Sequence, residues 1–303
     1  MTDDSGLFDP MPSDLDPYTA TSGTEAVAPL LYAIVRMLRA TSIVEYGPGH
    51  STIFLLKALA DNEKRERIEH DALVRKSRHT EVLRLAPDEV EGVPRPWSDE
   101  ARAAYRAWLY SDGPACGANP SFYCARRRPR LHSFETLPND HPYSQKVWKA
   151  IAALRLEAYF EPHYGEEFGT SHLPSQALPI DLAWNDCDNY RRFFTEYWEQ
   201  LTPNSGMMVF HNVTAWTPLF DDICWMSEQR RLHNDLELLV LEEPHKLNQN
   251  SCAILRRRTS RPHFGAERPH GVLNALREFL GTSDGACRLG TVWPLSEADQ
   301  ETR

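Results

Sequence analysis

The stretch SIVEYGPGHST, from Ser42 to Thr52, contains residue types that could hold a ligand. A short strand pattern leads into Gly47 and Gly49, and an apolar helical pattern follows at once. Glycines let the chain turn sharply, and they let a ligand approach the backbone without a Cβ in the way. This order predicts a loop for a nucleotide-like ligand. A tight turn without a ligand is the alternative, because Thr52 stands where a dinucleotide loop prefers a third glycine.

Polar side chains also end the other strands that the pattern predicts. Glu45 ends the first strand, Glu135 ends RLHSFETLP, Asp186 ends IDLAWND, and His211 and Asn212 end GMMVFHN. Ligands of parallel sheets bind beyond the carboxyl ends of the strands, so four polar strand ends in succession predict one site. The carboxylate of Glu135 can accept two hydrogen bonds from a ribose diol. A structural turn with a surface glutamate is the alternative.

The last two strand ends carry the candidate catalytic groups. His211 is our first candidate for a general base, and Asp186 is our candidate for orienting an acceptor. Asp186, His211 and Asn212 together offer a carboxylate, an imidazole and an amide oxygen, which could also hold a divalent ion. We favour a site without a metal, in which His211 is a base or a hydrogen-bonded strand-end residue.

Aromatic residues near these strand ends are candidates for binding the acceptor. Trp216 and Phe220 lie just past the fifth predicted strand, where they could form the wall of an acceptor pocket beside Asn212. Tyr105 and Trp108 lie in a segment inserted after the first strand and helix. We interpret these two residues as part of a lid.

Helical and strand patterns alternate along most of the chain. Strands are predicted over residues 42–46, 130–138, 157–162, 180–186, 206–212, 236–243 and 251–258. Helices are predicted over residues 24–39, 53–59, 144–154, 190–201 and 220–232. This alternation, closed by an antiparallel hairpin, predicts a doubly wound, mostly parallel, seven-stranded α/β sheet.

The predicted sheet belongs to a domain over residues 21–258. We interpret residues 1–20 as a flexible N-terminal arm. Residues 61–130 form an insertion, because this charge-rich and proline-bearing stretch is too long for a connecting loop. It would serve as a lid or as an oligomer contact, and it contains a predicted helix capped by Ser98. Residues 259–303 form a C-terminal extension whose short helix VLNALREFL could pack on the core or on a second subunit, which leaves a homodimer open.

The composition disfavours several classes of protein. The chain has 303 residues, of which 41% are hydrophobic and 25% charged, and its net charge of -10 argues against nucleic-acid binding. No apolar run approaches the ~20 residues of a membrane span, and the N-terminus lacks a signal-peptide pattern. The six cysteines form no C-x-x-C pair. These features predict a cytoplasmic protein that acts on small molecules.

Two segments resemble known motifs. VEYGPGHSTIFLLKAL resembles the first motif of class I S-adenosylmethionine-dependent methyltransferases, and DLAWNDCDNYRRFFTEYWEQLTPNSGMMVFHN is similar to their later motifs. The nearest group is the small-molecule methyltransferases with E-x-G-x-G-x-S-T and D-G-D-H-x-Y motifs. The resemblance covers most of residues 24–258, apart from the insertion. The chain departs from the pattern at Asn185, Cys187, Asn189 and Asn212, which affects acceptor chemistry more than cofactor binding.

The resemblance implies a role for each matching residue. The methionine part of S-adenosylmethionine would be lined by Glu45, Gly47 and Gly49, with Ser51 and Thr52 nearby. Glu135 would bind the ribose hydroxyls. Asp186 would lie beside the sulfonium and the acceptor.

The expected activity is therefore in-line transfer of a methyl group to an oxygen or nitrogen of a small molecule, in a biosynthetic pathway of specialised metabolism. Two alternatives remain open at this point. One is a metal- or nicotinamide-dependent oxidoreductase or hydroxylase on the same sheet. The other is a catalytically silent ligand-binding module.

Overall fold

The computed structural model describes residues 16–18, 23–78, 89–90, 93–94, 98–110, 122, 128–214, 216–231 and 233–258. The chain divides into two compact units. The first comprises Met1–Asn62 and Pro129–Arg261, and the second comprises Glu63–Arg128 and Pro262–Arg303. The residues expected to end the strands all belong to the first unit.

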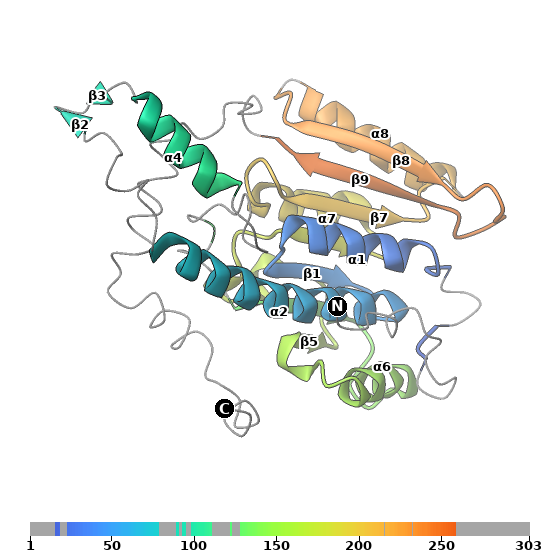
Figure 1. Cartoon of the computed structure of the whole chain (residues 1–303). Coiled ribbons are helices and arrows are strands. Elements are labelled where there is room, and N and C mark those ends of the chain that lie inside the picture. Colours follow the sequence, from blue (N-terminus) through green and yellow to red (C-terminus); the bar gives the residue numbers. More distant parts are fainter. Residues whose placement is uncertain are drawn as a thin grey trace. The chain divides into compact units, whose positions relative to one another are not determined.

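The first unit is built on a seven-stranded sheet with the order β5-β4-β1-β6-β7-β9-β8 (Figure 1). Its strands are β1 (Ser42–Tyr46), β4 (Arg130–Glu135), β5 (Phe160–Tyr164), β6 (Leu182–Asn185), β7 (Met207–His211), β8 (Leu236–Glu242) and β9 (Ser251–Arg257). The first five strands in this order are parallel, whereas β9 pairs antiparallel with both β7 and β8. The predicted doubly wound, mostly parallel sheet with a closing hairpin is confirmed.

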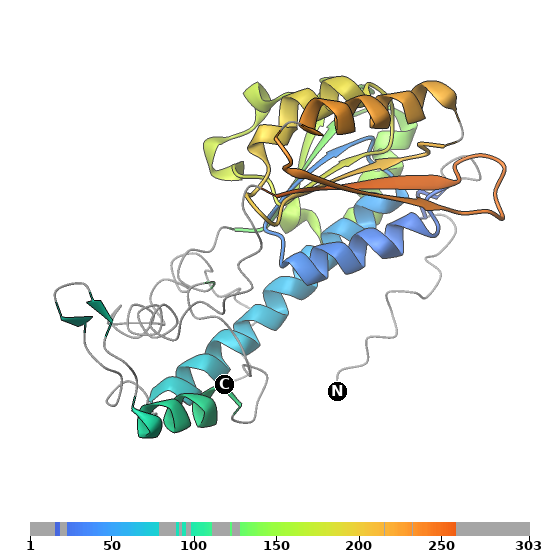
Figure 2. The same cartoon turned by 90° about the horizontal axis from the view of Figure 1, so that it is seen from above.

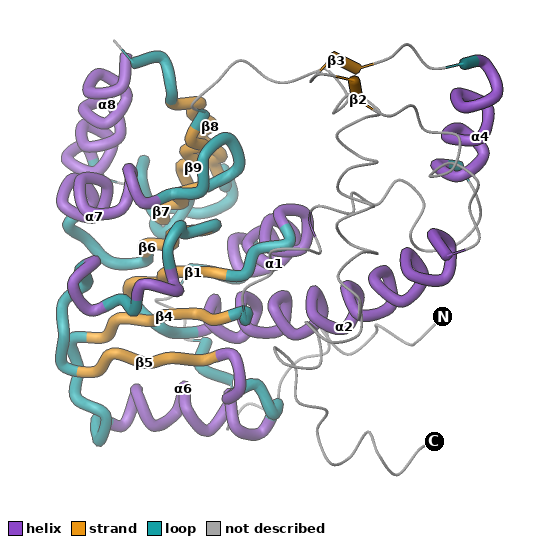
Figure 3. The backbone as a smooth tube through the Cα atoms, turned by 90° about the vertical axis from the view of Figure 1, so that its left-hand side faces the viewer, coloured by secondary structure: helices purple, strands orange, loops and turns teal. Residues whose placement is uncertain are grey.

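Helices cover both faces of this sheet (Figure 3). One face carries α1 (Val27–Leu38), the first part of α2 (His50–Arg78) and α6 (Pro142–Ala153). The other carries α7 (Tyr190–Tyr197) and α8 (Thr217–Arg231). Short 3₁₀ turns lie at η2 (Glu157–Tyr159), η3 (Thr170–His172), η4 (Ser175–Ala177) and η5 (Trp198–Gln200). Figure 2, turned by 90° from Figure 1, shows helices on both sides of the sheet.

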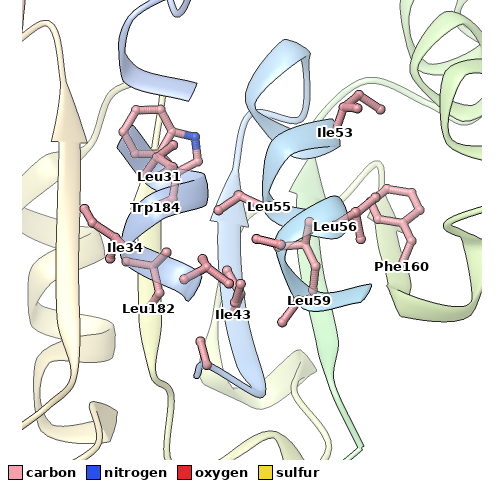
Figure 4. Close-up of a cluster of buried hydrophobic side chains, with 14 of the residues drawn as sticks. Leu31, Ile34, Ile43, Ile53, Leu55, Leu56, Leu59, Phe160, Leu182 and Trp184 are labelled. Atoms are coloured by element: carbon pink, nitrogen blue, oxygen red, sulfur yellow. The ribbon is translucent and has the colours of Figure 1, made fainter. Parts of the chain in front are cut away.

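The core consists of two apolar layers, one on each face of the sheet. Because successive side chains of a strand point to opposite faces, Ile43 of β1 packs toward α1 and α2, whereas Val44 packs toward α7. Figure 4 shows the first layer, in which Ile43 and Leu182 of the sheet lie among Leu31 of α1 and Leu55 of α2. This packing fixes which residues of each strand face each layer of helices.

Helix α2 is much longer than the apolar pattern predicted. The pattern predicted a helix over 53–59, but the helix continues to Arg78. Ion pairs at i,i+4 spacing accompany the continuation: Lys57–Asp61 at 2.6 Å, Arg67–Glu63 at 2.6 Å and Arg65–Glu69 at 2.8 Å. Such pairs stabilise a helix without an apolar stripe, so a pattern search based on hydrophobicity missed this part.

The described part of the second unit contains one further helix and a small strand pair. Helix α4 (Asp99–Leu109) confirms the predicted helix, and the Ser98 hydroxyl caps it by accepting a hydrogen bond from the N–H of Ala101 at 3.1 Å. Strands β2 (Glu89–Val90) and β3 (Val93–Pro94) pair antiparallel. The expected C-terminal helix and most of the expected N-terminal arm lie outside the described residues.

The parallel strands bring the candidate site residues to one edge of the sheet. In the register, Glu45 lies opposite Ser133 of β4, and Tyr46 lies opposite Asn185 of β6. The carboxyl ends of β4, β1, β6 and β7 therefore meet, as the crossover connections of a doubly wound sheet require. Within the described residues, no helix is long and apolar enough to cross a membrane.

Candidate active site

The glycine loop after β1 is packed against protein groups. Gly47 has φ +91°, and a Cβ on it would lie 2.5 Å from Sγ of Cys187. A Cβ on Gly49 would lie 2.6 Å from the hydroxyl oxygen of Tyr143. We expected glycines here so that a ligand could approach the backbone. A side chain at either position would therefore collide with a neighbouring side chain unless that neighbour moved, and the positive φ of Gly47 favours glycine independently.

Glu45 lies beneath this loop, and protein surrounds its carboxylate completely. Hydroxyl groups donate to it from Ser133 at 2.8 Å, Thr52 at 2.9 Å and Ser51 at 3.3 Å. Burial raises the pKa of Glu45 to about 8, the nearby carboxylate of Asp186 adds to the rise, and the hydroxyl groups oppose it. Thr52 also accepts a hydrogen bond from the N–H of Gly49 at 2.7 Å, which ties the loop to the buried acid.

These contacts define what the first motif does in this structure. The side chains of Glu45, Ser51 and Thr52 have no exposed surface, so as placed they shape the loop and do not reach a ligand. The indole N–H of Trp184 donates to the hydroxyl of Ser51 at 3.1 Å and extends the network to β6. Contact between the loop and a cofactor stays a prediction, and here it would come from the backbone.

A histidine and an aspartate form a pair at the ends of β7 and β6. Nδ1 of His211 lies 2.6 Å from Oδ1 of Asp186. The side chain of His211 is buried, and that of Asp186 keeps 16% of its surface exposed. Burial raises the pKa of Asp186, and the hydrogen bond from His211 opposes the rise. An ionised Asp186 holds the proton on Nδ1, which leaves the lone pair of Nε2 free to act as a base.

Two buried polar atoms at the end of β7 have no hydrogen-bond partner among the described residues. They are Nε2 of His211 and Oδ1 of Asn212. Asn212 has a left-handed backbone with φ 60°, and its N–H donates to the carbonyl of Ser251 at 2.6 Å. Leaving a buried polar atom unpaired costs roughly 1–3 kcal/mol, so such atoms call for a partner. A ligand that hydrogen-bonds to both atoms would supply it.

Glu135 lies at the end of β4, and only one of its two carboxylate oxygens accepts hydrogen bonds from described residues. Oε1 accepts a hydrogen bond from the N–H of Leu137 at 2.9 Å and a longer one from the Thr136 hydroxyl at 3.4 Å. No described residue donates to Oε2. The side chain is almost buried yet keeps some exposed surface, so a ligand can reach the second oxygen.

Sequence reasoning missed one residue of this edge, Tyr143. It lies in the first turn of α6, and its hydroxyl touches the glycine loop at Gly49. Burial raises its pKa to about 12, and the carboxylates of Asp186 and Glu135 add to the rise, which puts Tyr143 among the acids of the site. Its place in the helix start after Glu135 is the only signal that the sequence offered.

The residues that depart from the family pattern shape the turn after β6. The side chain of Asn185 accepts a hydrogen bond from the N–H of Cys187 at 2.9 Å and donates to the carbonyl of Asp188 at 3.0 Å. Asn189 has a left-handed backbone with φ 59° and directly precedes α7. These residues hold the turn that presents Asp186 to His211.

The remaining candidate residues lie beside α8 and on α4. Trp216 directly precedes α8 and is 64% exposed, so it is free to meet an acceptor but makes no wall by itself. Tyr105 and Trp108 lie on α4 in the second unit, with their ring centres 6.0 Å apart. Their role as a lid stays a prediction. Across the described segments, no group of three or more His, Cys, Asp or Glu is placed to hold a metal ion.

The architecture of the first unit is that of a doubly wound, Rossmann-like α/β fold. Its marks are the seven strands in the order β5-β4-β1-β6-β7-β9-β8 and the antiparallel β9 between β7 and β8. Counted in chain order within this sheet alone, the strands have the order 3-2-1-4-5-7-6. A dinucleotide-binding sheet has the order 3-2-1-4-5-6 and lacks the antiparallel strand between the fifth and sixth strands.

No protein-family model matches the chain, and a search of curated proteins finds no match. Among solved structures, the chain is similar to the O-methyltransferase TomG of Streptomyces achromogenes, crystallised with S-adenosylmethionine. The identity is 12%, the match covers 84% of this chain and 93% of TomG, and the TM-score is 0.49. An O-methyltransferase of Bacillus cereus in complex with S-adenosylhomocysteine is 14% identical, with 84% and 94% of the chains covered and a TM-score of 0.42. At these values the activities of the two proteins are not carried over to this chain.

Proposed function

We propose that this chain transfers a methyl group from S-adenosylmethionine to an oxygen or nitrogen of a small molecule. The observation that carries the proposal is the buried Nε2 of His211, which faces no described partner and is held in place through Asp186. It lies at the same edge of the sheet as Glu135, whose Oε2 accepts no hydrogen bond from a described residue. Methyl transfer from a ribose-containing cofactor needs a base for the acceptor and a carboxylate for the ribose diol, and both lie at this edge of the sheet.

The residues present suit this cofactor. The free oxygen of Glu135 would accept hydrogen bonds from the ribose hydroxyls, and the backbone of the glycine loop would lie along the methionine part. When bound, S-adenosylmethionine supplies a methyl group already activated by its sulfonium. The protein then has to align the acceptor and remove a proton from it.

His211 and Asn212 would do this work on the acceptor. When the acceptor oxygen or nitrogen bonds to the methyl carbon and the carbon–sulfur bond breaks, with S-adenosylhomocysteine as the leaving group, Nε2 of His211 would take the proton of the acceptor. The carboxylate of Asp186, 2.6 Å from Nδ1, would stabilise the imidazolium. Oδ1 of Asn212 would accept a hydrogen bond from a second polar group of the acceptor. The net charge of -10 favours a small molecule over a nucleic acid, in line with a biosynthetic role.

A nicotinamide-dependent activity is the weaker alternative. Thr52 occupies the position of the third glycine, and its hydroxyl is engaged by Glu45 and Gly49. The sheet order also differs from that of dinucleotide-binding proteins.

Calorimetry tests the cofactor assignment. We expect S-adenosylhomocysteine to bind the wild type, and Glu135→Ala to weaken binding by roughly 10- to 100-fold, because hydrogen bonds to a charged group contribute about 1.5–3 kcal/mol each. Glu161→Ala, an exposed change on β5, is the matched control and should leave the affinity unchanged. Equal affinities of wild type and Glu135→Ala would remove the ribose assignment.

A thermal-shift panel separates the three classes of function. The panel contains S-adenosylmethionine, NAD(H), NADP(H) and divalent ions, and a bound ligand raises the melting temperature. Stabilisation by a nicotinamide cofactor or a metal, and not by S-adenosylmethionine, would favour an oxidoreductase or hydroxylase. Binding of S-adenosylmethionine without turnover of any hydroxylated or amino acceptor would favour a silent module.

A further inference from the structure

Strand β8 leaves one edge of the sheet open to pairing. It is the last strand in the order, and its outer edge pairs with no strand of the described residues. It has seven residues, LELLVLE, and no proline. A long apolar edge strand presents unpaired N–H and C=O groups, and proteins normally protect or cover such an edge.

The opposite edge of the same sheet is protected. Strand β5 has five residues, FEPHY, with Pro162 at its centre and Glu161 exposed beside it. A central proline removes a ladder donor and discourages pairing with another chain. The two edges of this sheet therefore differ in kind, and only β5 carries the protection.

Three exposed side chains of β8 are apolar, and its two exposed acids, Glu237 and Glu242, lie near its ends. Leu238, Leu239 and Leu241 are 41%, 53% and 37% exposed. Glu237 is already paired within the hairpin, with Arg256 at 3.2 Å and Arg258 at 3.0 Å. The middle of the strand is therefore apolar, and the charge of Glu237 is neutralised by its two arginine partners.

We propose that a second copy of this chain covers the edge by pairing β8 antiparallel with β8 around a twofold axis at Leu239. Such an axis is perpendicular to the sheet, so each side chain of β8 lies beside a side chain of the second copy on the same face of the joined sheet. Leu239 is the middle of Leu236–Glu242, and an axis there uses the whole strand.

The length of the strand selects this register. With the axis at Leu239, each Glu237 lies opposite Leu241 of the second copy, and each Glu242 lies opposite Leu236, so all seven residues are paired. With the axis at Val240, Glu237 would lie opposite Glu243, which follows the end of the strand. An axis at Leu238 would leave Leu241 and Glu242 opposite residues beyond the strand.

The same symmetry brings more surface to the interface than the strand alone. A twofold axis perpendicular to the sheet keeps each face on its own side, so the α8 helices of both copies lie on one face of a joined fourteen-stranded sheet. A strand pair alone falls short of the roughly 800 Å² per partner of a stable interface, so the proposed dimer also requires contact between the α8 helices.

Light scattering and sedimentation of the full chain test the interface. We expect a dimer for the wild type, and a rise of roughly 100-fold in its Kd for Leu239→Lys, because two buried leucines are lost and two lysines lie opposite each other. Leu247→Lys is the control, since Leu247 is 98% exposed in the hairpin loop and the change should leave the dimer intact. A monomeric wild type, or a Leu239→Lys dimer as tight as the wild type, would overturn the proposal.

Two further variants remove the objection that Leu239→Lys merely misfolds. Mixing Leu239→Lys with Leu239→Glu should restore dimers, because opposite charges then meet at the axis. Leu239→Cys should form a disulfide between copies on mild oxidation, since directly opposite residues have Cα atoms about 4.5–5.5 Å apart. Leu241→Cys should not, because the same axis separates its two copies by four residues of strand. Cross-linking of Leu241→Cys instead would disprove the register.

Discussion

Replacing Glu45 by glutamine should change how the stability of the protein depends on pH. The carboxyl of Glu45 is fully buried beneath the glycine loop, and burial raises its pKa from 4.5 to about 8, with the carboxylate of Asp186 adding to the rise. A glutamine has nearly the same shape and can hydrogen-bond with the same hydroxyls of Ser51, Thr52 and Ser133. It cannot titrate, so the substitution removes one proton equilibrium and little else.

The sign and size of the effect follow from the two pKa values. Because the folded protein holds this proton more tightly than the unfolded chain, the stabilisation is fully present below pH 4.5 and is lost as the pH rises toward 8. Between the two pKa values, the titration of one such group lowers the free energy of unfolding by about 1.36 kcal/mol for each pH unit. Between pH 5 and pH 7 the wild type should therefore lose about 2.5 kcal/mol relative to Glu45→Gln.

Urea unfolding of both proteins at pH 5, 6, 7 and 8 measures this loss. The free energy of unfolding of the wild type minus that of Glu45→Gln should fall steadily with pH and level off above pH 8. The other titrating groups are common to both proteins, so they cancel in this difference. Glu161→Gln, on the exposed edge strand, is the matched control and should show a constant difference. A constant difference for Glu45→Gln as well would refute the assignment of a raised pKa to this buried acid.

Two further predictions concern the base and the loop. His211→Ala should lower kcat by about 10²- to 10⁴-fold, while the affinity for S-adenosylhomocysteine stays within twofold of wild type. A wild-type rate would dismiss His211 as the base. His233→Ala, in an exposed turn, is the control. Gly49→Ala should cost about 1–3 kcal/mol of stability in urea, because its Cβ would lie 2.6 Å from the Tyr143 hydroxyl. Adding Tyr143→Phe should recover most of that loss, and a double variant no more stable than Gly49→Ala would show that this contact is not the cause.

The strands and the class of the sheet could be predicted from the sequence because each strand carries its own short signal. The strand pattern of Ser42–Tyr46 and the apolar runs before Asp186 and His211 were sufficient to predict parallel strands with polar ends. The third strand was predicted to begin at Glu157, but Glu157–Tyr159 is a 3₁₀ turn and β5 begins at Phe160. Local propensity does not separate a short turn from the start of a strand.

The geometry of the site could not be predicted in the same way, because it depends on contacts between distant residues. A strand pattern shows that Glu45 ends β1, but the three hydroxyls that enclose it come from two different segments, and Ser133 is 88 residues away. Tyr143 reaches the loop only because α6 packs on the same face as α2. The pairing of His211 with Asp186 likewise requires the register of β6 with β7.

The packing of Cys187 and Tyr143 against Gly47 and Gly49 has a consequence for how a ligand would bind. These two side chains support the loop from the protein side, and the buried acid beneath it holds the helix start. The loop therefore loses its conformational entropy when the chain folds, and little is left to lose on binding. We expect ligand association at this loop to be a single docking step onto a surface that already has its shape.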